Sequence, residues 1–199
     1  MSIETPGEDT IASKTENENQ NKFLSFSLGK EEYGLEILRV REIIGVLDIT
    51  PLPQTPDYVK GVINLRGKII PVIELRRKFN MDSVDYTEET CVIVVEVTTP
   101  AGDEQFQMGV IVDNVSEVRN IARDQIEPAP EFGSLLNTGY ILGMGKIKTA
   151  ERTSVLILLD IDKVVSLEDL GESATHQIGS AETAEAAESD QSITTRAAA

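Results

Sequence analysis

Apolar residues along this chain mostly recur at every second position or in short runs, which is typical of β-strands rather than helices. Residues 23–28 and 33–37 alternate in this way around the polar turn 29–32, and together they predict a β-hairpin. The same pattern predicts further strands over residues 68–73, 91–97, 105–112 and 154–159. The sequence therefore predicts an all-β protein built from short strands.

Three details refine this pattern. Pro71 lies inside the strand predicted at 68–73, and a proline in a strand indicates a sheet edge or a bulge, because proline lacks the N–H that a ladder needs. Only residues 74–80 and 161–170 have a helical pattern, and both segments are short. Asp160 or Asp162 is expected to cap the start of the second helix, and Gly171 to end it.

An internal repeat relates the two halves of the chain. Each half ends with an apolar strand followed by an acid, Glu74 in the first half and Asp160 in the second. Four motifs occur in the same order in both halves: Gly34-Leu35-x-Ile37-x-x-Val40-x-Glu42-Ile43 with Gly109-Val110-x-Val112-x-x-Val115-x-Glu117-Val118, Ile49-x-Pro51-x-Pro53 with Ile126-x-Pro128-x-Pro130, Tyr58-x-x-Gly61 with Tyr140-x-x-Gly143, and Ile73-Glu74-Leu75 with Leu159-Asp160-Ile161.

The repeat predicts two copies of one small β-unit, and short strands with Gly and Pro corners favour small barrels. The strands at 23–28 and 154–159 need not pair within their own halves. We hypothesise that they exchange between the halves and lock the barrels together. Residues 1–21 and 171–199 are polar, lack an apolar face and are predicted to be disordered tails, which leaves 22–170 as the folded body.

The charge balance narrows the function. The formal net charge is −16, from 34 acidic and 18 basic residues. Such a chain repels phosphate, so nucleic-acid binding and attraction to anionic lipid are not expected. No signal peptide is visible, and no apolar run approaches the roughly 20 residues that span a bilayer, so we expect a soluble, cytoplasmic protein without membrane insertion. The single cysteine, Cys91, is expected to be a reduced residue within a strand.

The chain offers few groups for catalysis. Its only histidine, His176, lies in the acidic C-terminal tail, where it cannot hold catalytic geometry. Gly143-Met144-Gly145 is not followed by a phosphate-binding helix and is read as a strand corner. The acidic pairs Glu31–Glu32 and Asp160–Asp162 are read as a solvated turn and a helix cap, and Asp113–Asn114 as a turn. We therefore expect no enzyme activity, no cofactor and no metal site.

One charged group is not explained by the fold alone. Arg39, Arg41 and Glu42 surround the apolar Val40, and Arg66 lies in a turn that Asn64 and Gly67 already specify. An arginine in a turn is often only solvated. Its planar guanidinium also suits hydrogen bonding at protein interfaces, so both interpretations stay open at this point.

The residues over 22–170 resemble the CheW family. The resemblance is carried by Phe23-Leu24-x-Phe26-x-Leu28-Gly29-x-Glu31-x-Tyr33-Gly34, by Val40-Arg41-Glu42-Ile43, by the run from Tyr58 to Arg76 that contains Asn64-Leu65-Arg66-Gly67, and by Val110-Ile111-Val112-Asp113-x-Val115-Ser116-Glu117-Val118. This family implies two intertwined, SH3-like five-stranded β-barrels with short helices. It also implies a cytoplasmic adaptor that binds the tip of chemoreceptors and the regulatory domain of the histidine kinase CheA within membrane-associated receptor arrays.

The resemblance also assigns candidate site residues. Val40, Glu42 and Arg66 match receptor-contacting positions, and Thr90 and Cys91 match positions at the kinase contact. Phe132 matches a position at the contact that closes rings of adaptors and kinases. Glu127 lies beside it, where some relatives carry arginine, and this charge difference leaves its role open. The family implies CheW–CheW contacts in arrays.

Two functional readings remain open from the sequence. The chain is too short to hold the additional domains of CheA or of adaptors fused to a receiver domain, so a free chemotaxis adaptor is favoured. The alternative is a CheW-like scaffold of a non-flagellar system that controls pilus motility or development. The sequence does not identify the receptor and therefore cannot choose between them.

Overall fold

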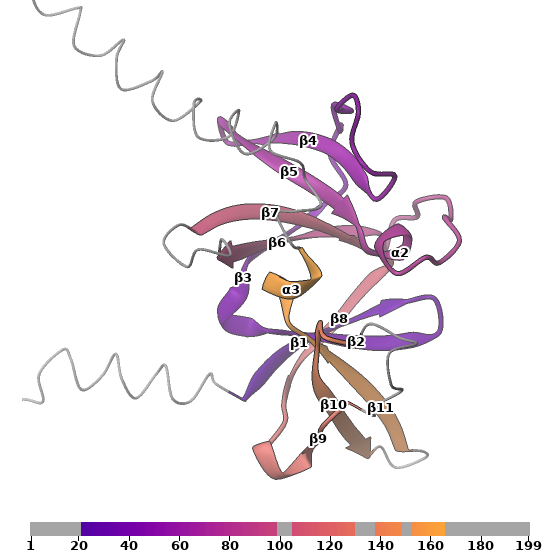
Figure 1. Ribbon diagram of the computed structural model, residues 1–199, viewed down its shortest axis with the longest axis vertical. Coiled ribbons are helices and arrows are strands. Elements are labelled where there is room, and N and C mark those ends of the chain that lie inside the picture. Colours follow the sequence, from indigo (N-terminus) through magenta and orange to yellow (C-terminus); the bar gives the residue numbers. More distant parts are fainter. Residues whose placement is uncertain (1–20, 99–104, 130–137, 149–152, 166–199) are drawn as a thin grey trace, which may run out of the picture.

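The strands form two curled sheets. The structure, a computed structural model, describes residues 21–98, 105–129, 138–148 and 153–165. Figure 1 shows the sheets one above the other, with helix α3 between them. Barrel I, the upper one, has the strand order β3-β6-β7-β5-β4, and barrel II has the order β8-β1-β2-β11-β10-β9. The strands of barrel I are β3 (Val40–Gly45), β4 (Val59–Leu65), β5 (Lys68–Glu74), β6 (Cys91–Thr98) and β7 (Gln105–Val112). The strands of barrel II are β1 (Lys22–Leu28), β2 (Glu31–Glu36), β8 (Asn114–Asn120), β9 (Ile126–Glu127), β10 (Ile141–Lys148) and β11 (Thr153–Leu159).

The predicted fold class is confirmed, with one difference in strand number. Barrel II gains the two-residue strand β9, in which Glu127 pairs with Met144 of β10. The counterpart in barrel I is an isolated bridge, where Thr50 and Val62 exchange two backbone hydrogen bonds of 2.9 Å. After β3 in barrel I and after β8 in barrel II, the chain crosses to the opposite edge of the same sheet and pairs there. These short pairings close the two barrels.

Each barrel contains strands from both halves of the sequence. The hairpin β1–β2 belongs to barrel II, and the equivalent hairpin β6–β7 belongs to barrel I. The parallel pairs β2–β11 and β5–β7 join the halves, with Gly34 opposite Leu158 and Gly109 opposite Val72. The predicted exchange is therefore confirmed for residues 23–28. It is wrong for 154–159, because β11 remains paired with β10 of its own half.

The two repeated glycines allow this exchange. A Cβ on Gly34 would lie 3.0 Å from the side chains of Leu156 and Leu158, and a Cβ on Gly109 would lie 2.8 Å from that of Val92. Val92 lies within the same hairpin as Gly109, and Val72 of the parallel neighbour would lie 3.1 Å from that Cβ, so a side chain at either glycine would force its neighbours to shift.

Three apolar cores result from this architecture. Ile63 and Val92 lie in the core of barrel I, and Phe23 and Leu156 lie in the core of barrel II. The largest cluster lies between the barrels and takes residues from both sheets and from α3 (Ile161–Val164). Strand β6 alternates between the core of barrel I and the shared core, which explains its nearly continuous apolar sequence.

Two local predictions need correction. Strand β5 is not an edge, because it lies between β7 and β4. Pro71 is tolerated there because β7 pairs with β5 only from Val72 onward, and the register shift lies opposite, between Val59 and Gly61 of β4. The first helix, α2 (Leu75–Lys78), is shorter than the predicted 74–80, because Glu74 keeps an extended backbone and ends β5.

Two ion pairs tie the helices to the exchanged hairpins. Arg76 of α2 donates two hydrogen bonds of 2.6 Å to Asp113, which also accepts the backbone N–H of Gly29 at 2.7 Å. Asp162 of α3 accepts from Arg39 at 2.5 Å and from the backbone N–H of Thr98 at 2.8 Å. Asp113 does lie in the predicted turn, but its side chain has this further structural role.

The predicted helix cap on α3 is wrong. Asp160 occupies the N-cap position, yet its side chain makes no capping hydrogen bond and instead pairs with Lys163 at 2.9 Å. Asp162 binds Arg39 and Thr98 as described above. The helix predicted over 161–170 is also too long, because α3 ends at Val164 and Val165 already leaves the helical conformation. Gly171, His176 and the two predicted tails apart from Asn21 lie outside the described residues.

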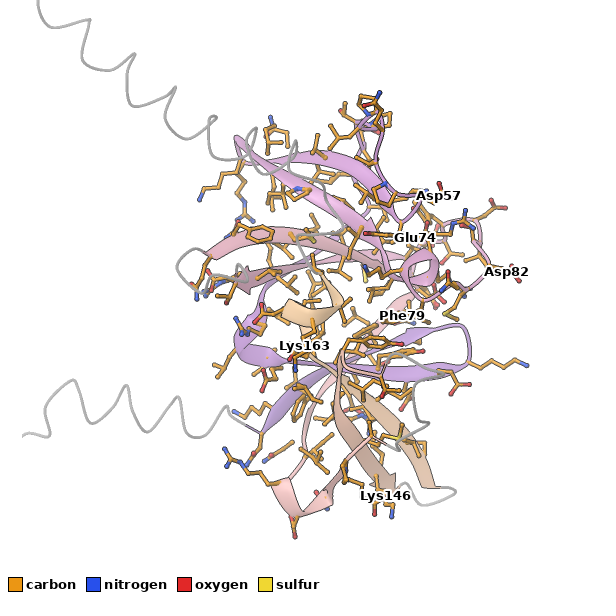
Figure 2. The ribbon with its side chains drawn as sticks, viewed as in Figure 1. Asp57, Glu74, Phe79, Asp82, Lys146 and Lys163 are labelled. Carbon is orange, nitrogen blue, oxygen red and sulfur yellow. The ribbon has the colours of Figure 1, made fainter. Side chains whose placement is uncertain are left out.

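A stack of four aromatic rings crosses the boundary between the barrels. Phe79, which follows α2, lies between Tyr33 of β2 and Tyr140 before β10, with ring centroids 5.7 Å and 5.2 Å apart. Phe26 of β1 continues the stack beyond Tyr33 at 5.8 Å. Figure 2 shows Phe79 where the two barrels meet. A residue of the first half is thus held between two aromatic residues of barrel II.

Candidate functional site

The structure brings together two of the three predicted receptor-contacting residues. Arg66 lies in the β4–β5 turn and donates to both carboxylate oxygens of Glu42 on β3, at 2.8 Å and 3.3 Å. Asn64 shapes this turn by accepting the backbone N–H of Gly67 at 2.9 Å, and Arg66 itself has a positive φ of 53°. The pair spans the seam between β3 and the β4–β5 turn, and the Arg66 side chain remains 78% exposed.

Apolar residues lie close in sequence to the two members of this ion pair. Val40 begins β3 and is half-buried against the shared core. Ile43, directly after Glu42, is 46% exposed, and Ile69, just beyond the Arg66 turn, is 50% exposed. We call Val40, Glu42, Ile43, Arg66 and Ile69 the seam surface. Exposed apolar side chains and a bidentate ion pair on neighbouring segments have the composition of a protein-binding site.

The predicted receptor-contacting residues do not include the two isoleucines of the seam surface. Ile43 follows Glu42 in a strand where every other residue is exposed, so its position in the alternation could have revealed it. Ile69 lies in an entirely apolar run, where no alternation separates inward from outward positions.

Thr90 directly precedes β6 and Cys91 begins it, and neither side chain is fully exposed. Thr90 is buried, and its Oγ1 accepts the backbone N–H of Thr87 at 2.9 Å. Cys91 is half-buried between Gly45 of β3 and Val112 of β7. Burial raises the pKa of the Cys91 thiol and outweighs an opposing hydrogen bond with the backbone of Val115, so the thiol stays protonated at neutral pH.

Glu127 lies on β9 and pairs with Lys146 of β10 at 2.5 Å. Both side chains line a cavity of about 600 Å³ between β8 and β10, which also contains Arg119. Arg119 pairs with Glu117 at 2.9 Å through Nη2, while its Nε is buried without a hydrogen bond. Phe132, the other predicted ring-contact residue, lies outside the described residues.

The described residues show neither a metal-ligand cluster nor a membrane-spanning helix. Within the described parts of the chain, no three histidine, cysteine, aspartate or glutamate side chains are grouped as metal ligands would be. No helix among those same residues is long and apolar enough to cross a membrane.

Known proteins resemble both the sequence and the fold. A family model described as "CheW-like domain" matches residues 22–169. The chain is 46% identical over 149 residues to the chemotaxis protein CheW of Klebsiella aerogenes, which covers 75% of this chain and 84% of that protein. It is 32% identical over 165 residues to the chemotaxis protein CheW of Treponema pallidum, which covers 77% and 87%.

A solved structure agrees with these relatives. The crystal structure of the scaffolding protein TtCheW from Thermoanaerobacter tengcongensis superposes with a TM-score of 0.62 at 34% identity, covering 73% of this chain and 87% of that one. The family model matches most of the chain, and the exchanged two-barrel fold agrees with it. This chain belongs to the CheW family of chemotaxis scaffold proteins.

Proposed function

We propose that this chain is a non-catalytic adaptor that couples chemoreceptors to the histidine kinase CheA. The observation that carries the proposal is the Glu42–Arg66 ion pair, with the exposed Ile43 next to Glu42 in sequence and the exposed Ile69 just after the Arg66 turn. Relatives named chemotaxis protein CheW and a scaffolding protein of the same fold support it.

The receptor would bind at the seam surface through its helical cytoplasmic hairpin. Val40, Ile43 and Ile69 supply apolar area that a helix can cover. Arg66 is exposed, and its guanidinium already binds a carboxylate. It can therefore turn from Glu42 to an acidic receptor side chain and form a new ion pair there. Glu42 would then accept from a basic receptor residue, and the two charges would fix the orientation of the helix.

The kinase would bind next to Thr90 and Cys91. Because the Thr90 hydroxyl holds the backbone of Thr87, its role is to shape the loop before β6 rather than to touch the partner. Cys91 would lie near the contact. The ring contact would involve Glu127 together with Phe132, and Glu127 would have to exchange Lys146 for a basic group of the neighbour.

Chemotaxis is favoured over a non-flagellar array because the relatives reported above are named chemotaxis proteins. The protein would act in the cytoplasm, recruited to membrane-associated receptor arrays. Non-catalytic scaffolding and CheW–CheW contacts within these arrays complete the proposal.

The test is co-sedimentation of the full chain with receptor-containing membranes and CheA, comparing wild type with Arg66→Ala. We expect receptor recruitment to fall about tenfold while kinase binding is retained, because Arg66 orients only the receptor. Arg77→Ala is the matched control, since Arg77 is also an arginine in an exposed ion pair, with Asp57, but lies on α2. Unchanged receptor recruitment in Arg66→Ala contradicts the assigned site, and equal loss of both partners indicates misfolding.

A further inference from the structure

A second cavity lies on barrel I, away from the Glu42–Arg66 pair. Its volume is about 390 Å³, and it lies between the chain that follows β3, strands β4 and β5, and the irregular segment after α2. We call it the Glu74 pocket. Its lining residues are Ile49, Pro51, Lys60, Glu74 and residues 83–86.

Glu74 provides a buried carboxylate to this pocket. Its side chain is 3% exposed, and Oε2 is buried without a hydrogen bond. The Lys60 ammonium lies 3.4 Å from Oε2 and is only partly withdrawn from solvent. A buried carboxylate that lacks hydrogen bonds is costly, so this oxygen favours any donor that reaches it. Asp160, the repeat counterpart of Glu74, is instead 21% exposed and paired with Lys163.

The wall of the pocket is apolar and faces solvent. Val84 is 47% exposed and Tyr86 is 40% exposed, although neither lies in a helix or strand. Burial, with a contribution from Glu74, raises the pKa of Tyr86 to about 12, so the phenol keeps its proton at neutral pH. The pocket therefore combines a negative base, a neutral aromatic wall and exposed aliphatic carbon.

We propose that the Glu74 pocket binds an arginine side chain of the kinase regulatory domain. The aliphatic stem would lie along Val84 and Pro51, the guanidinium would stack on Tyr86, and its N–H groups would bind Glu74 Oε2. The two carboxylates of Glu74 and Asp85 exceed the single charge of Lys60, which leaves the pocket attractive to a cation. Lys60 would move outward as the guanidinium enters.

We choose the kinase as the partner because the segment that lines the pocket continues along the chain into the proposed kinase contact. Residues 83–86 continue directly into Thr87, whose backbone N–H the Thr90 hydroxyl holds, and then into Cys91. A kinase domain seated at Thr90 and Cys91 would therefore adjoin the pocket, so this inference rests on the proposed function. The Arg66 side of the seam surface lies on a different turn, between β4 and β5.

The pocket itself can be tested without any partner. N-acetyl-arginine amide is titrated into the full, isotope-labelled chain while backbone NMR signals are recorded. We expect saturable shifts at Val84 and Tyr86 in wild type, at least about tenfold weaker binding in Glu74→Gln, and no such shifts with the neutral N-acetyl-citrulline amide. Equal shifts with citrulline amide, or none with arginine amide, overturn the proposal.

Two further variants separate binding from folding. Lys60→Met removes the resident cation and is expected to tighten arginine-amide binding severalfold, an increase that a purely structural role of Glu74 would not produce. Asp57→Asn is the matched control, because Asp57 is an exposed acid near α2, paired with Arg77 and absent from the pocket lining. Figure 2 shows Asp57 and Glu74 on the same part of barrel I. Weaker arginine-amide binding in Lys60→Met contradicts the model of an exchanged cation.

Binding of full-length CheA then tests the partner. Glu74→Gln is expected to weaken kinase binding about tenfold while receptor recruitment is unchanged, and Asp57→Asn to change neither. Arginine-amide binding with undiminished kinase affinity in Glu74→Gln overturns the kinase assignment. If the wild-type chain bound no kinase, the proposed function would fail, while the titration would still decide whether the pocket accepts arginine.

Discussion

The two helix ties start from equivalent helix residues of the repeat, Arg76 and Asp162, which carry opposite charge. In the first, the arginine (Arg76) is on the helix and the aspartate (Asp113) follows the exchanged hairpin β6–β7. In the second, the aspartate (Asp162) is on the helix and the arginine (Arg39) follows the hairpin β1–β2. Each aspartate also accepts one backbone N–H, from Gly29 or Thr98. The repeat thus preserves the connection between helix and hairpin, while the direction of the charge pair is free to invert.

The two ties also differ in burial, and this difference should decide how much each contributes to the free energy of unfolding. Arg76 is 13% exposed and forms two hydrogen bonds to Asp113, whereas Arg39 is 30% exposed and divides its hydrogen bonds between Asp162 and Thr98. Ion pairs that are withdrawn from water leave a larger penalty when one partner is removed. The Arg76 tie should therefore contribute more to stability.

The largest effect should come from removing an exchanged strand. Deletion of residues 22–28 removes β1, and with it Phe26 and Leu28 from the shared core and the pairing of both β2 and β8. We expect barrel II to lose its fold, as shown by loss of cooperative unfolding in circular dichroism and collapse of NMR dispersion for residues 141–159. Intact barrel II signals with selective loss of barrel I would contradict the exchange.

Arg76→Ala should have the next largest effect, a loss of about 3 kcal/mol in the free energy of unfolding, because Asp113 is left partly buried without its cation. Urea denaturation measures this value. Arg39→Ala is the matched comparison and should cost about 1 kcal/mol, since Arg39 is more exposed than Arg76 and makes one hydrogen bond to its aspartate instead of two. Equal losses would show that burial does not distinguish the two ties.

Acid should weaken the first tie. Burial alone would raise the pKa of Asp113, but hydrogen bonds from Arg76 and Gly29 outweigh it and hold the pKa below the ordinary value of 3.8. The unfolded chain therefore takes up the proton first as pH falls. This contribution to stability is complete above pH 3.8 and is lost as pH falls through the lower pKa of the folded state.

The check is the urea midpoint of wild type and Asp113→Asn between pH of about 6 and about 2. The variant should start less stable and lose less stability on acidification, because it has no carboxylate to protonate. Parallel curves for the two proteins would mean that Asp113 has the same pKa in the folded and unfolded states.

The smallest effect on stability is expected from Arg66→Ala. The Arg66–Glu42 pair also joins separate elements, but the arginine is largely exposed, so its loss should cost less than about 1 kcal/mol. Thermal denaturation checks this. A loss comparable with that of Arg76→Ala would mean that the pair closes barrel I structurally, and the receptor test would then need Arg66→Lys instead.

Alternation and the repeat predicted where most strands lie but not which strands they join. Period two identifies the faces of a strand, and the buried sequence of β6 could be located from its apolar run. The partner of a strand depends on contacts distant in sequence. For that reason Pro71 suggested an edge, although β5 lies between two strands and only the part of β5 beyond Pro71 pairs with β7.

The candidate site shows the same limit. Asn64 and Gly67 identified the turn that carries Arg66, because turn chemistry is local. Its approach to Glu42 is a tertiary contact that only the resemblance suggested. The sequence indicates only a turn at Asp113, because its partner Arg76 lies far away in the sequence, before the β6–β7 hairpin. The burial of Glu74 could not be predicted, because an acid at the end of a strand usually faces water.

The exchanged hairpins have a consequence for the order in which the protein is completed during synthesis. The β1–β2 hairpin is made first, yet β8 and β11, its neighbours in barrel II, are made only after all the strands of barrel I. Barrel I needs nothing beyond β7 and can close earlier. The apolar side chains of the β1–β2 hairpin therefore emerge from the ribosome before the strands that finally cover them have been made. These side chains are Leu24, Phe26, Leu28 and Leu35. The segment most exposed to premature association is the one that later joins the two barrels.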